Sequence, residues 1–594
     1  MAKAGGKKGK KAPKVKKTPE QLLAEKEKRA KAKIKRDHEK LIQKLISATG
    51  FKQLTSLIDK QFTFKGQQSD FDDVFIYENV VIVVEYTASV SNIGEHLKLK
   101  KIPFDHIYNN QSDFIAFLKS GFPEFAQEAK SIYPNHSYRV VVLYCSRYEF
   151  KVTYKDQVTS AKYMDYNIAM YFSNLAATIR HSARHELLQF MDVPAGEVGM
   201  DVLNTQGATE EKFRGSVLPS SHSMFEDGYK VISFYANPAA LLQRAYVLRR
   251  EGWRDEAGLY QRIIGKKKVD LIRSYLLEKK RVFVNNIIVT IPDDAMIYGD
   301  DGHTQDADAV KKTQSATVSL PKRHNSIGII DGQHRVFSYY EGGDHDEEIG
   351  QMRQVQNLLV TGVMFPPGTS DGDKLKFEAR LFAEINANQT SVPPALLQEI
   401  DLILKPFSPI SIAKRVITLM NDRSGPFNNE FARYSHDVEK IKTSSIVSFG
   451  LKQVVKLDSD ESLFSVWDKP NKGLLLEGKD QDLLSEYVEF CFKIISEYFI
   501  EIRKALPNGS WVTSRKDQFY FLNTVNINGT ILFQREILRA QGKLDPSELD
   551  GKLDFLKTFE FSKYKSSQYN RMSQDMYALY AASEQQAGPT SASV

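Results

Sequence analysis

Three carboxylates stand on two neighbouring apolar runs about 80 residues into the chain. Asp72 and Asp73 lie near the start of one run, and Glu85 lies near the end of the next, Val80–Thr87. Runs rich in Val, Ile, Phe and Tyr predict strands, and a two-residue turn between them places Asp72 opposite Glu85. Like charges this close are costly unless a cation or proton bridges them. The pattern indicates either a Mg²⁺ site with Asp73 and Glu85 as metal ligands, or a solvated sheet edge.

The elements around these carboxylates have a recognisable order. An amphipathic helix from about residue 34 to Gly50 precedes the hairpin, and a helix near Phe114–Lys119 and a strand over Tyr138–Tyr144 follow it. The order of helix, acid-bearing hairpin, helix and strand resembles the PD-(D/E)xK nuclease core over residues 34–150. The resemblance implies metal-dependent DNA cleavage, with acids that hold Mg²⁺ and a lysine that positions the attacking water.

This chain departs from the nuclease pattern at one position. Thr87 stands where that superfamily usually has its lysine, two residues after the glutamate. Lys98 or Lys101 could reach back into the site, as in relatives whose lysine has moved to the next helix, and Glu39 on the first helix could add a metal ligand. We therefore predict the catalytic set Asp72, Asp73, Glu85 and Lys98. An inactive relic that keeps only the fold is the alternative.

A second candidate site lies at residues 331–335. The apolar run Ile327–Ile330 predicts a buried strand that meets Asp331-Gly332 directly before a helical segment. Free N–H groups at the start of a helix attract anions, Gly332 permits close approach of a ligand to the backbone, and Arg335 offers a bidentate fork. The corner is either a phosphate site, or a structural turn in which Asp331 caps the helix while His334 and Arg335 form ion pairs.

The string Asp331-Gly332-Gln333-His334-Arg335 resembles the signature of DGQHR-domain proteins, which include DndB-like regulators of DNA phosphorothioation and are similar to the ParB/sulfiredoxin superfamily. The segments 260–289 and 381–392 extend this resemblance to about residues 228–420. It implies contacts to a nucleotide triphosphate or a substrate phosphate. Gln333 replaces the acidic or cysteine residue of ParB and sulfiredoxin relatives, so neither CTP switching nor sulfinic acid reduction is expected. The predicted nucleotide- or phosphate-binding residues are Asp331, Gly332, Gln333, His334, Arg335, Asn386, Asn388 and Gln389.

The amides near residue 387 leave two interpretations open. Asn386, Asn388 and Gln389 follow a predicted helix, where amide groups can read base edges or cap the helix and satisfy neighbouring backbone.

His181 and His185 are four residues apart, as zinc ligands on one helix face often are. Arg184 between them opposes a cation, and no glutamate follows the first histidine. A structural role is therefore expected for both histidines.

Charge and composition narrow the class of protein. The chain has 594 residues and a net charge of +7, but residues 1–40 carry +11 and the remaining residues carry −4. The basic tail could contact nucleic-acid phosphates or could only confer solubility. With two cysteines, Cys145 and Cys491, disulfides and a cysteine-based zinc site are not expected. No apolar run is long enough to span a membrane, so we expect a cytoplasmic, nucleoid-associated location.

Together these patterns predict a mixed α/β fold in five segments. They are a disordered basic tail (1–33), a restriction-endonuclease-like domain (34–200), a DGQHR domain of the DndB/ParB-like kind (201–425), a helical region (426–580) and a disordered tail (581–594). The expected function is DNA binding or processing in prokaryotic DNA modification or phage defence. Mg²⁺ and a nucleotide triphosphate are the candidate cofactors. The alternatives are a non-catalytic DNA-binding transcriptional regulator and a nucleotide-binding or nucleotide-hydrolysing protein. Subunit number and operon partners stay open.

Overall fold

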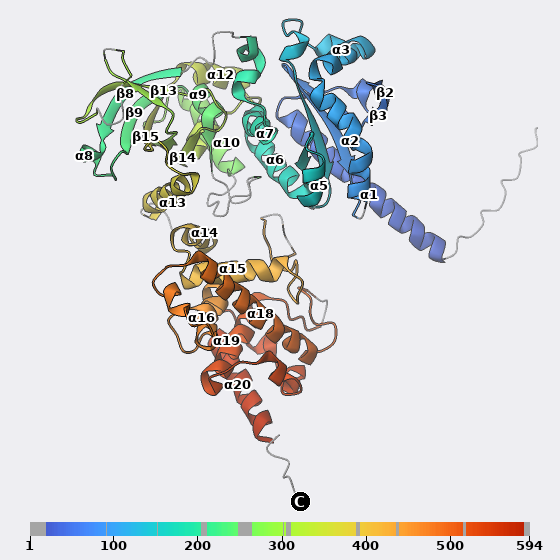
Figure 1. Cartoon of the computed structure of the whole chain (residues 1–594), viewed down its shortest axis with the longest axis vertical. Helices are drawn as coiled ribbons and strands as arrows, with labels where there is room; N and C mark the ends of the chain where they lie inside the picture. The colour runs from blue at the N-terminus through green and yellow to red at the C-terminus, as the bar shows by residue number, and fades with distance from the viewer. Residues whose placement is uncertain are drawn as a thin grey trace, which may run out of the picture. The chain divides into compact units, whose positions relative to one another are not determined.

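The computed structural model of the chain is a mixed α/β structure of two compact units (Figure 1). The first unit contains residues 1–246 and 264–367, and the second contains residues 247–263 and 368–594. None of the helices in the described residues has both the length and the apolar character needed to cross a bilayer. The structure describes residues 19–90, 92–150, 152–203, 211–247, 253, 264–300, 302–304, 310–387, 393–434, 437, 439–514 and 518–586.

The first unit begins with a five-stranded sheet in the order β1-β4-β5-β6-β7. β4 and β5 are antiparallel, whereas β6 runs parallel to both β5 and β7. The crossover from β5 to β6 contains three helices, as a parallel connection requires. The strands are β1 (Lys52–Gln53), β4 (Asp73–Tyr77), β5 (Val80–Thr87), β6 (Arg139–Ser146) and β7 (Ala161–Met164), and β2 (Lys60–Phe64) pairs separately with β3 (Gln67–Phe71). The helices are α1 (Pro19–Ala48), α2 (Ile93–Asn109), α3 (Gln111–Gly121), α4 (Pro123–Glu128), α5 (Val152–Gln157), α6 (Tyr166–Ile179) and α7 (Arg184–Phe190).

The middle strand β5 is buried along its whole length, which explains its uninterrupted apolar sequence. Side chains of α2 and α3, such as Leu97 and Phe114, share one core with Val81 and Val83 of β5. Helix α1 packs against α6, and Nε2 of its His38 lies 3.3 Å from the carbonyl oxygen of Cys145 on β6. The sheet therefore fixes the relative positions of residues carried by α1, α2 and the hairpin β4–β5.

The rest of the first unit is built on an eight-stranded sheet in the order β10-β14-β11-β15-β9-β8-β13-β12. The segment after Pro292 contributes β12 and β13, and β13 pairs with β8 over seven positions. The strands are β8 (Glu211–Pro219), β9 (Lys230–Ala236), β10 (Ala245–Tyr246), β11 (Ile287–Ile291), β12 (Met296–Tyr298), β13 (Gln314–Leu320), β14 (Ile327–Asp331) and β15 (Leu358–Met364). The helices are α8 (Ser220–Ser223), α9 (Pro238–Arg244), α10 (Lys266–Lys279), α11 (Gln333–Phe337) and α12 (Asp346–Val355).

The second unit is helical in its described residues. Its core surrounds the long helix α18, which buries Tyr487, Cys491 and Tyr498. Helices α13 to α15 belong to this unit, although the sequence pattern groups their residues with the preceding segment. The helices are α13 (Asp371–Ala387), α14 (Pro394–Leu404), α15 (Pro409–Asp422), α16 (Lys452–Val455), α17 (Leu463–Val466), α18 (Gln481–Ala505), α19 (Thr524–Gln541) and α20 (Tyr569–Gln586).

Candidate active site

The hairpin pairing predicted for the carboxylates is confirmed. β4 and β5 pair with Asp73 opposite Val84 and Tyr77 opposite Val80. The next position in this register brings Asp72 opposite Glu85. The backbone N–H of Tyr86 donates a 2.7 Å hydrogen bond to Oδ2 of Asp72. Asp72 and Glu85 therefore lie together at the open end of the hairpin.

Helix α2 adds two basic side chains to these carboxylates. His96 and Lys100 are four residues apart and so share one face of the helix. Nε2 of His96 lies 3.2 Å from Oε1 of Glu85, and Nζ of Lys100 lies 2.8 Å from Oε2. Lys100 also reaches Oδ1 of Asp70 at 2.6 Å. We refer to Asp70, Asp72, Glu85, His96 and Lys100 as the Glu85 cluster.

The charges of the Glu85 cluster perturb one another. Burial and the neighbouring Glu85 carboxylate raise the pKa of Asp72 to about 6, although the Tyr86 N–H and Lys100 act in the opposite direction. Burial alone would lower the pKa of Lys100, but the carboxylates of Glu85 and Asp70 raise it above its ordinary value. Lys100 is therefore positively charged at neutral pH. The Asp72 carboxyl gains or loses its proton around pH 6, slightly below neutral pH. Such perturbed groups are concentrated at functional sites.

Asp73 lies on the other face of the sheet, because successive residues of a strand point in opposite directions. Its side chain is fully buried. Oδ2 accepts hydrogen bonds from Gln43 and from the Tyr86 hydroxyl, each at 2.8 Å, and Oδ1 accepts one from Gln53 at 2.7 Å. The structure does not bring Asp73 and Glu85 together as a ligand pair. The predicted metal-ligand pair Asp73 and Glu85 is therefore wrong, whereas Asp72 lies opposite Glu85 as predicted.

The other charged residues named from the sequence lie outside the Glu85 cluster. Lys98 is exposed and pairs with Glu95 at 2.9 Å. Lys101 donates a hydrogen bond to the carbonyl oxygen of Gln157. Glu39 on α1 lies 3.6 Å from Lys35. The choice of Lys98 is therefore wrong, and the lysine of α2 that contacts Glu85 is Lys100.

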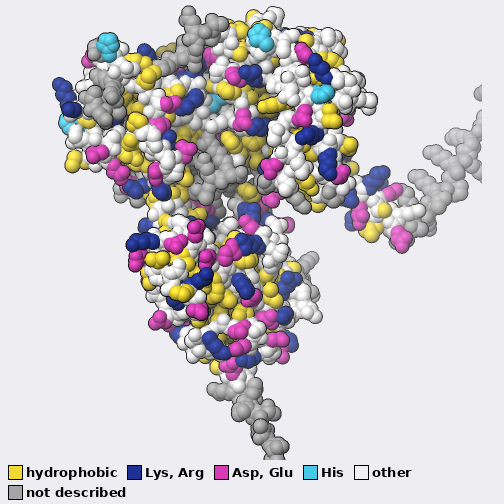
Figure 2. Space-filling view, in the orientation of Figure 1, with side chains coloured by type: hydrophobic (Ala, Val, Ile, Leu, Met, Phe, Trp, Pro, Cys, Tyr) yellow, Lys and Arg dark blue, Asp and Glu magenta, His cyan; other side chains and the backbone are white. Residues whose placement is uncertain are grey.

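A cavity of about 500 Å³ adjoins Asp72 on the side of α1. Tyr86 and Glu39 line it together with three basic residues of α1, namely Arg29, Lys35 and Arg36. Figure 2 shows basic side chains along the projecting part of α1, with acidic and apolar ones between them. The cavity thus combines the three cations of α1 with three carboxylates, those of Glu39, Asp59 and Asp72. The cations could attract a phosphate group toward Asp72.

The donor set of the Glu85 cluster fits a hard divalent metal ion. In the described residues no group of three or more His, Cys, Asp or Glu side chains is arranged to hold a metal. Mg²⁺ commonly needs only one or two carboxylates, because water and substrate phosphate complete its shell. Asp72 and Glu85 would hold such an ion, and its charge would relieve the repulsion that raises the pKa of Asp72.

The corner at residues 331–335 is a strand, a turn and a helix, as the sequence predicted. Gly332 adopts φ +97° between β14 and α11. The backbone N–H groups of Arg335 and Val336 donate to the carbonyl of Gly332, and the Arg335 guanidinium pairs with Asp331 at 2.9 Å. Burial, with a smaller contribution from Lys268, lowers the pKa of His334 to about 4. The ion pair of Arg335 agrees with the structural interpretation, but the predicted cap is wrong, because the N-cap residue of α11 is Gly332 and no side chain caps this helix.

Gln333 and the amide residues complete the predicted phosphate set. Oε1 of Gln333 is buried and has no hydrogen-bond partner among the described residues. Nδ2 of Asn386 donates a 2.8 Å hydrogen bond to the carbonyl oxygen of Phe382, one turn earlier in α13. This contact agrees with a local structural role for Asn386. Asn388 and Gln389 lie outside the described residues.

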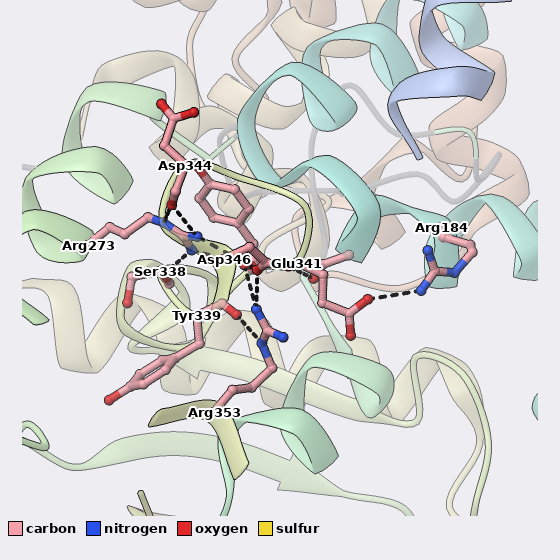
Figure 3. Close-up of polar contacts among 10 residues, drawn as sticks. Arg184, Arg273, Ser338, Tyr339, Glu341, Asp344, Asp346 and Arg353 are labelled. Atoms are coloured by element: carbon pink, nitrogen blue, oxygen red, sulfur yellow. Dashed lines mark hydrogen bonds and ion pairs between the residues drawn. The ribbon is translucent and has the colours of Figure 1, made fainter. Parts of the chain in front are cut away.

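Two arginines hold the loop that follows the corner (Figure 3). Arg273 of α10 donates to the carbonyl oxygens of Ser338, Tyr340 and Asp344, and its guanidinium lies 4.1 Å from the centre of the Tyr340 ring. Arg353 of α12 donates to the carbonyl oxygens of Tyr339 and Tyr340 and to Asp346. We refer to residues 338–346 as the clamped loop.

The clamped loop also contacts the N-terminal half of the first unit. Glu341 pairs with Arg184 at 2.9 Å, and its carbonyl oxygen accepts a hydrogen bond from the backbone N–H of His181. Gly342, at φ +74°, passes so close to the His181 ring that a Cβ atom there would lie 2.4 Å from it. His181 is thus a packing residue of this contact, which agrees with the structural role predicted for it.

His185 has the predicted structural role as well, and its burial gives a pH-dependent stability. Its ring centre lies 5.2 Å from that of His324. Burial, with a contribution from Arg184, lowers the pKa of His185 well below 6.5 and that of His324 to about 4. The unfolded chain binds protons at these histidines below about pH 6.5, whereas the folded chain does not, so stability falls as the pH drops.

We expect each of these histidines to destabilise the first unit by about 2 kcal/mol between pH 7 and pH 5. Hydrogen exchange of the peptide 184–190 as a function of urea and pH would measure the effect. His324→Gln should reduce the slope of stability against pH. An equal slope in the wild type and the variant would contradict the assignment to His324.

The sequence prediction missed His96, Lys100 and Asp70. The spacing of His96 and Lys100 was a usable signal, because a helix that begins soon after Glu85 must direct one of its faces toward the hairpin. The comparison with relatives whose lysine has moved to the next helix does not take helical phase into account, and Lys98 and Lys101 contact Glu95 and the Gln157 carbonyl oxygen instead of Glu85. Asp70 could not be found, because β3 pairs with β2 in a separate small sheet.

Comparison of the chain with protein-family models, with curated proteins and with solved structures gave no match.

Proposed function

We propose that this protein hydrolyses phosphodiester bonds in DNA at the Glu85 cluster with the help of a divalent metal ion. The observation that carries the proposal is the contact of Lys100 with Glu85 beside the half-buried Asp72. Two carboxylates and a lysine on a hairpin and the following helix are the groups that metal-dependent nucleases need. The resemblance of residues 34–150 to the PD-(D/E)xK core supports the same activity.

Hydrolysis requires two tasks of the chain, metal binding and stabilisation of charge. Asp72 and Glu85 would bind the metal ion, which supplies Lewis acidity toward the phosphate and a water of lowered pKa. Lys100 lies where its ammonium can stabilise the additional negative charge on the phosphoryl oxygens. Water oxygen bonds to phosphorus, the ester bond to the leaving oxygen breaks with its electron pair, and that oxygen gains the proton that water loses overall.

The cations on α1 would hold the phosphate backbone near the cluster. Arg29, Lys35 and Arg36 line the cavity that Asp72 also lines. Such contacts bind DNA without sequence preference and weaken as salt is added. Within the proposal, the DGQHR-like segment contributes recognition in a prokaryotic DNA-modification or phage-defence system.

The contacts of Lys100 also support a second candidate function, that of a non-catalytic DNA-binding regulator. Lys100 bridges Glu85 and Asp70 and so neutralises part of the charge that would otherwise attract a metal ion. In a protein that only binds DNA, this ion pair would be a permanent structural element and the cations of α1 would carry the affinity.

The test is cleavage of supercoiled plasmid in Mg²⁺ or Mn²⁺ by the full chain and by two matched variants. Glu85→Gln should reduce cleavage at least a hundredfold, because it removes a metal-binding charge without a large change in shape. Glu95→Gln removes an exposed carboxylate of the same helix region and should leave the rate unchanged. Plasmid binding without cleavage by the wild type in either metal would refute the nuclease and support the regulator.

A further inference from the structure

A second cavity, of about 420 Å³, lies over the eight-stranded sheet, in the other half of the first unit from the Glu85 cluster. It opens over β8, β9 and β13, strands that are labelled in Figure 1. Its size is within the range of small-ligand sites. The polar and aromatic residues that line it are Arg214, Ser216, Ser233, Tyr235, Asp300 and Ser315.

The register of the sheet arranges hydroxyl groups in a row across this surface. Ser315 pairs with Ser216, Ser216 pairs with Ser233, and Ser233 pairs with Thr361. The side-chain oxygens of Ser233 and Thr361 lie 3.4 Å apart, and Nδ2 of Asn286 donates to Thr361 at 2.8 Å. Hydroxyl groups both donate and accept, so this row can bind the varied polar atoms of a sugar-phosphate chain.

Next to the hydroxyl row are an aromatic ring and two opposite charges. Tyr235 is 61% exposed, although it lies in the middle of the sheet and next to Leu359. Within the described part of the chain, the side chains of Arg214, Tyr235 and Asp300 have no hydrogen-bond or ion-pair partner. An arginine and an aspartate that line one cavity without pairing are both available to a ligand.

We infer that this cavity binds one nucleotide of a single-stranded nucleic acid. An exposed tyrosine on an antiparallel sheet is a surface on which a base can stack. The free guanidinium of Arg214 matches a phosphate in geometry and charge. The Asp300 carboxylate only accepts hydrogen bonds, so it selects bases with N–H groups on the exposed edge. Guanine is favoured, because its ring N–H and its amino group present two adjacent donors to a carboxylate.

This site is independent of the proposed cleavage, and binding can be measured without metal. The probes are a fluorescent ten-residue dT oligonucleotide and the same oligonucleotide with one central dG, titrated with the full chain in EDTA at physiological salt. Tyr235→Ala should weaken binding of both about tenfold, since stacking carries much of the affinity. Tyr520→Ala removes a partly exposed tyrosine of the second unit and should have no effect. Asp300→Ala should abolish the preference for the dG oligonucleotide.

Three results would overturn the inference. One is equal affinity of the wild type and Tyr235→Ala, which would place binding on the basic tail and α1. Another is a wild type that does not distinguish the two oligonucleotides. The last is displacement of the probe by a neutral oligosaccharide as effectively as by unlabelled oligonucleotide, which would identify a saccharide site. Loss of plasmid cleavage has no bearing on any of these outcomes.

Discussion

Lys100→Met should reduce metal-dependent plasmid cleavage about 10²- to 10³-fold, the usual cost of removing one group that stabilises charge in a transition state. Lys100 is the half-buried lysine of the Glu85 cluster, in contact with Glu85 at 2.8 Å and Asp70 at 2.6 Å. Methionine keeps much of the length of the side chain and removes its charge. Single-turnover cleavage with saturating enzyme would measure the chemical step separately from DNA binding.

A change in pH dependence should accompany the loss of rate. Lys100 lowers the pKa of Asp72, which burial and Glu85 together raise to about 6. Without the lysine, the pKa of Asp72 rises further and more of the carboxyl is protonated at neutral pH. The rising limb of residual activity against pH should therefore move to higher pH, and more metal should be needed at pH 7. A role of Lys100 in folding alone would not move this limb.

Lys98→Met is the matched control, because Lys98 lies on the same helix, is exposed and pairs with Glu95. It should cleave plasmid at the wild-type rate. Full activity of Lys100→Met together with an inactive Lys98→Met would contradict the role assigned to Lys100 and restore the lysine chosen from the sequence.

The hairpin could be predicted from the sequence because two local rules specify it. Strand-forming residues flank Glu78-Asn79, and a two-residue turn fixes the register, so the approach of Asp72 to Glu85 followed directly. The opposite orientation of Asp73 was also available from strand alternation. Its partners were not, because Gln43 on α1 and Gln53 on β1 approach it only through the tertiary fold.

The strand–turn–helix corner shows a different limit of prediction from the sequence. Gly332 and the apolar run before it predicted the backbone path correctly. The Arg335 side chain could point outward to a ligand or back to Asp331. The two contacts have similar geometry and the sequence allows both, so it does not decide between them. The cavity beside Tyr235 was also beyond prediction, since β13 comes from a segment far along the chain from β8 and β9, and its register with β8 emerges only in the assembled sheet.

Arg273→Met should destabilise the first unit by about 2 to 5 kcal/mol, because each buried carbonyl oxygen that loses its donor costs about 1 to 3 kcal/mol. Arg273 is 5% exposed and donates to three carbonyl oxygens of the clamped loop (Figure 3). Methionine can fill part of the space but leaves the Ser338 and Asp344 carbonyl groups without this donor, whereas Tyr340 keeps its hydrogen bond from Arg353. Arg273→Lys should recover only a small part of the loss, because one ammonium cannot match the planar fork that reaches Ser338, Tyr340 and Asp344 together.

The effect should extend beyond the loop to the N-terminal half of the unit. Glu341 of the clamped loop pairs with Arg184, whose guanidinium also donates to the carbonyl oxygen of Thr49 at the end of α1. Loosening the loop should therefore raise hydrogen exchange at residues 180–190 as well as at 338–346. Arg281→Met is the control, since Arg281 is exposed and contacts the Tyr275 hydroxyl. Unfolding by urea would give the stability difference. An Arg273→Met chain as stable as Arg281→Met would show that Arg273 does not stabilise the contact between the clamped loop and residues 180–190.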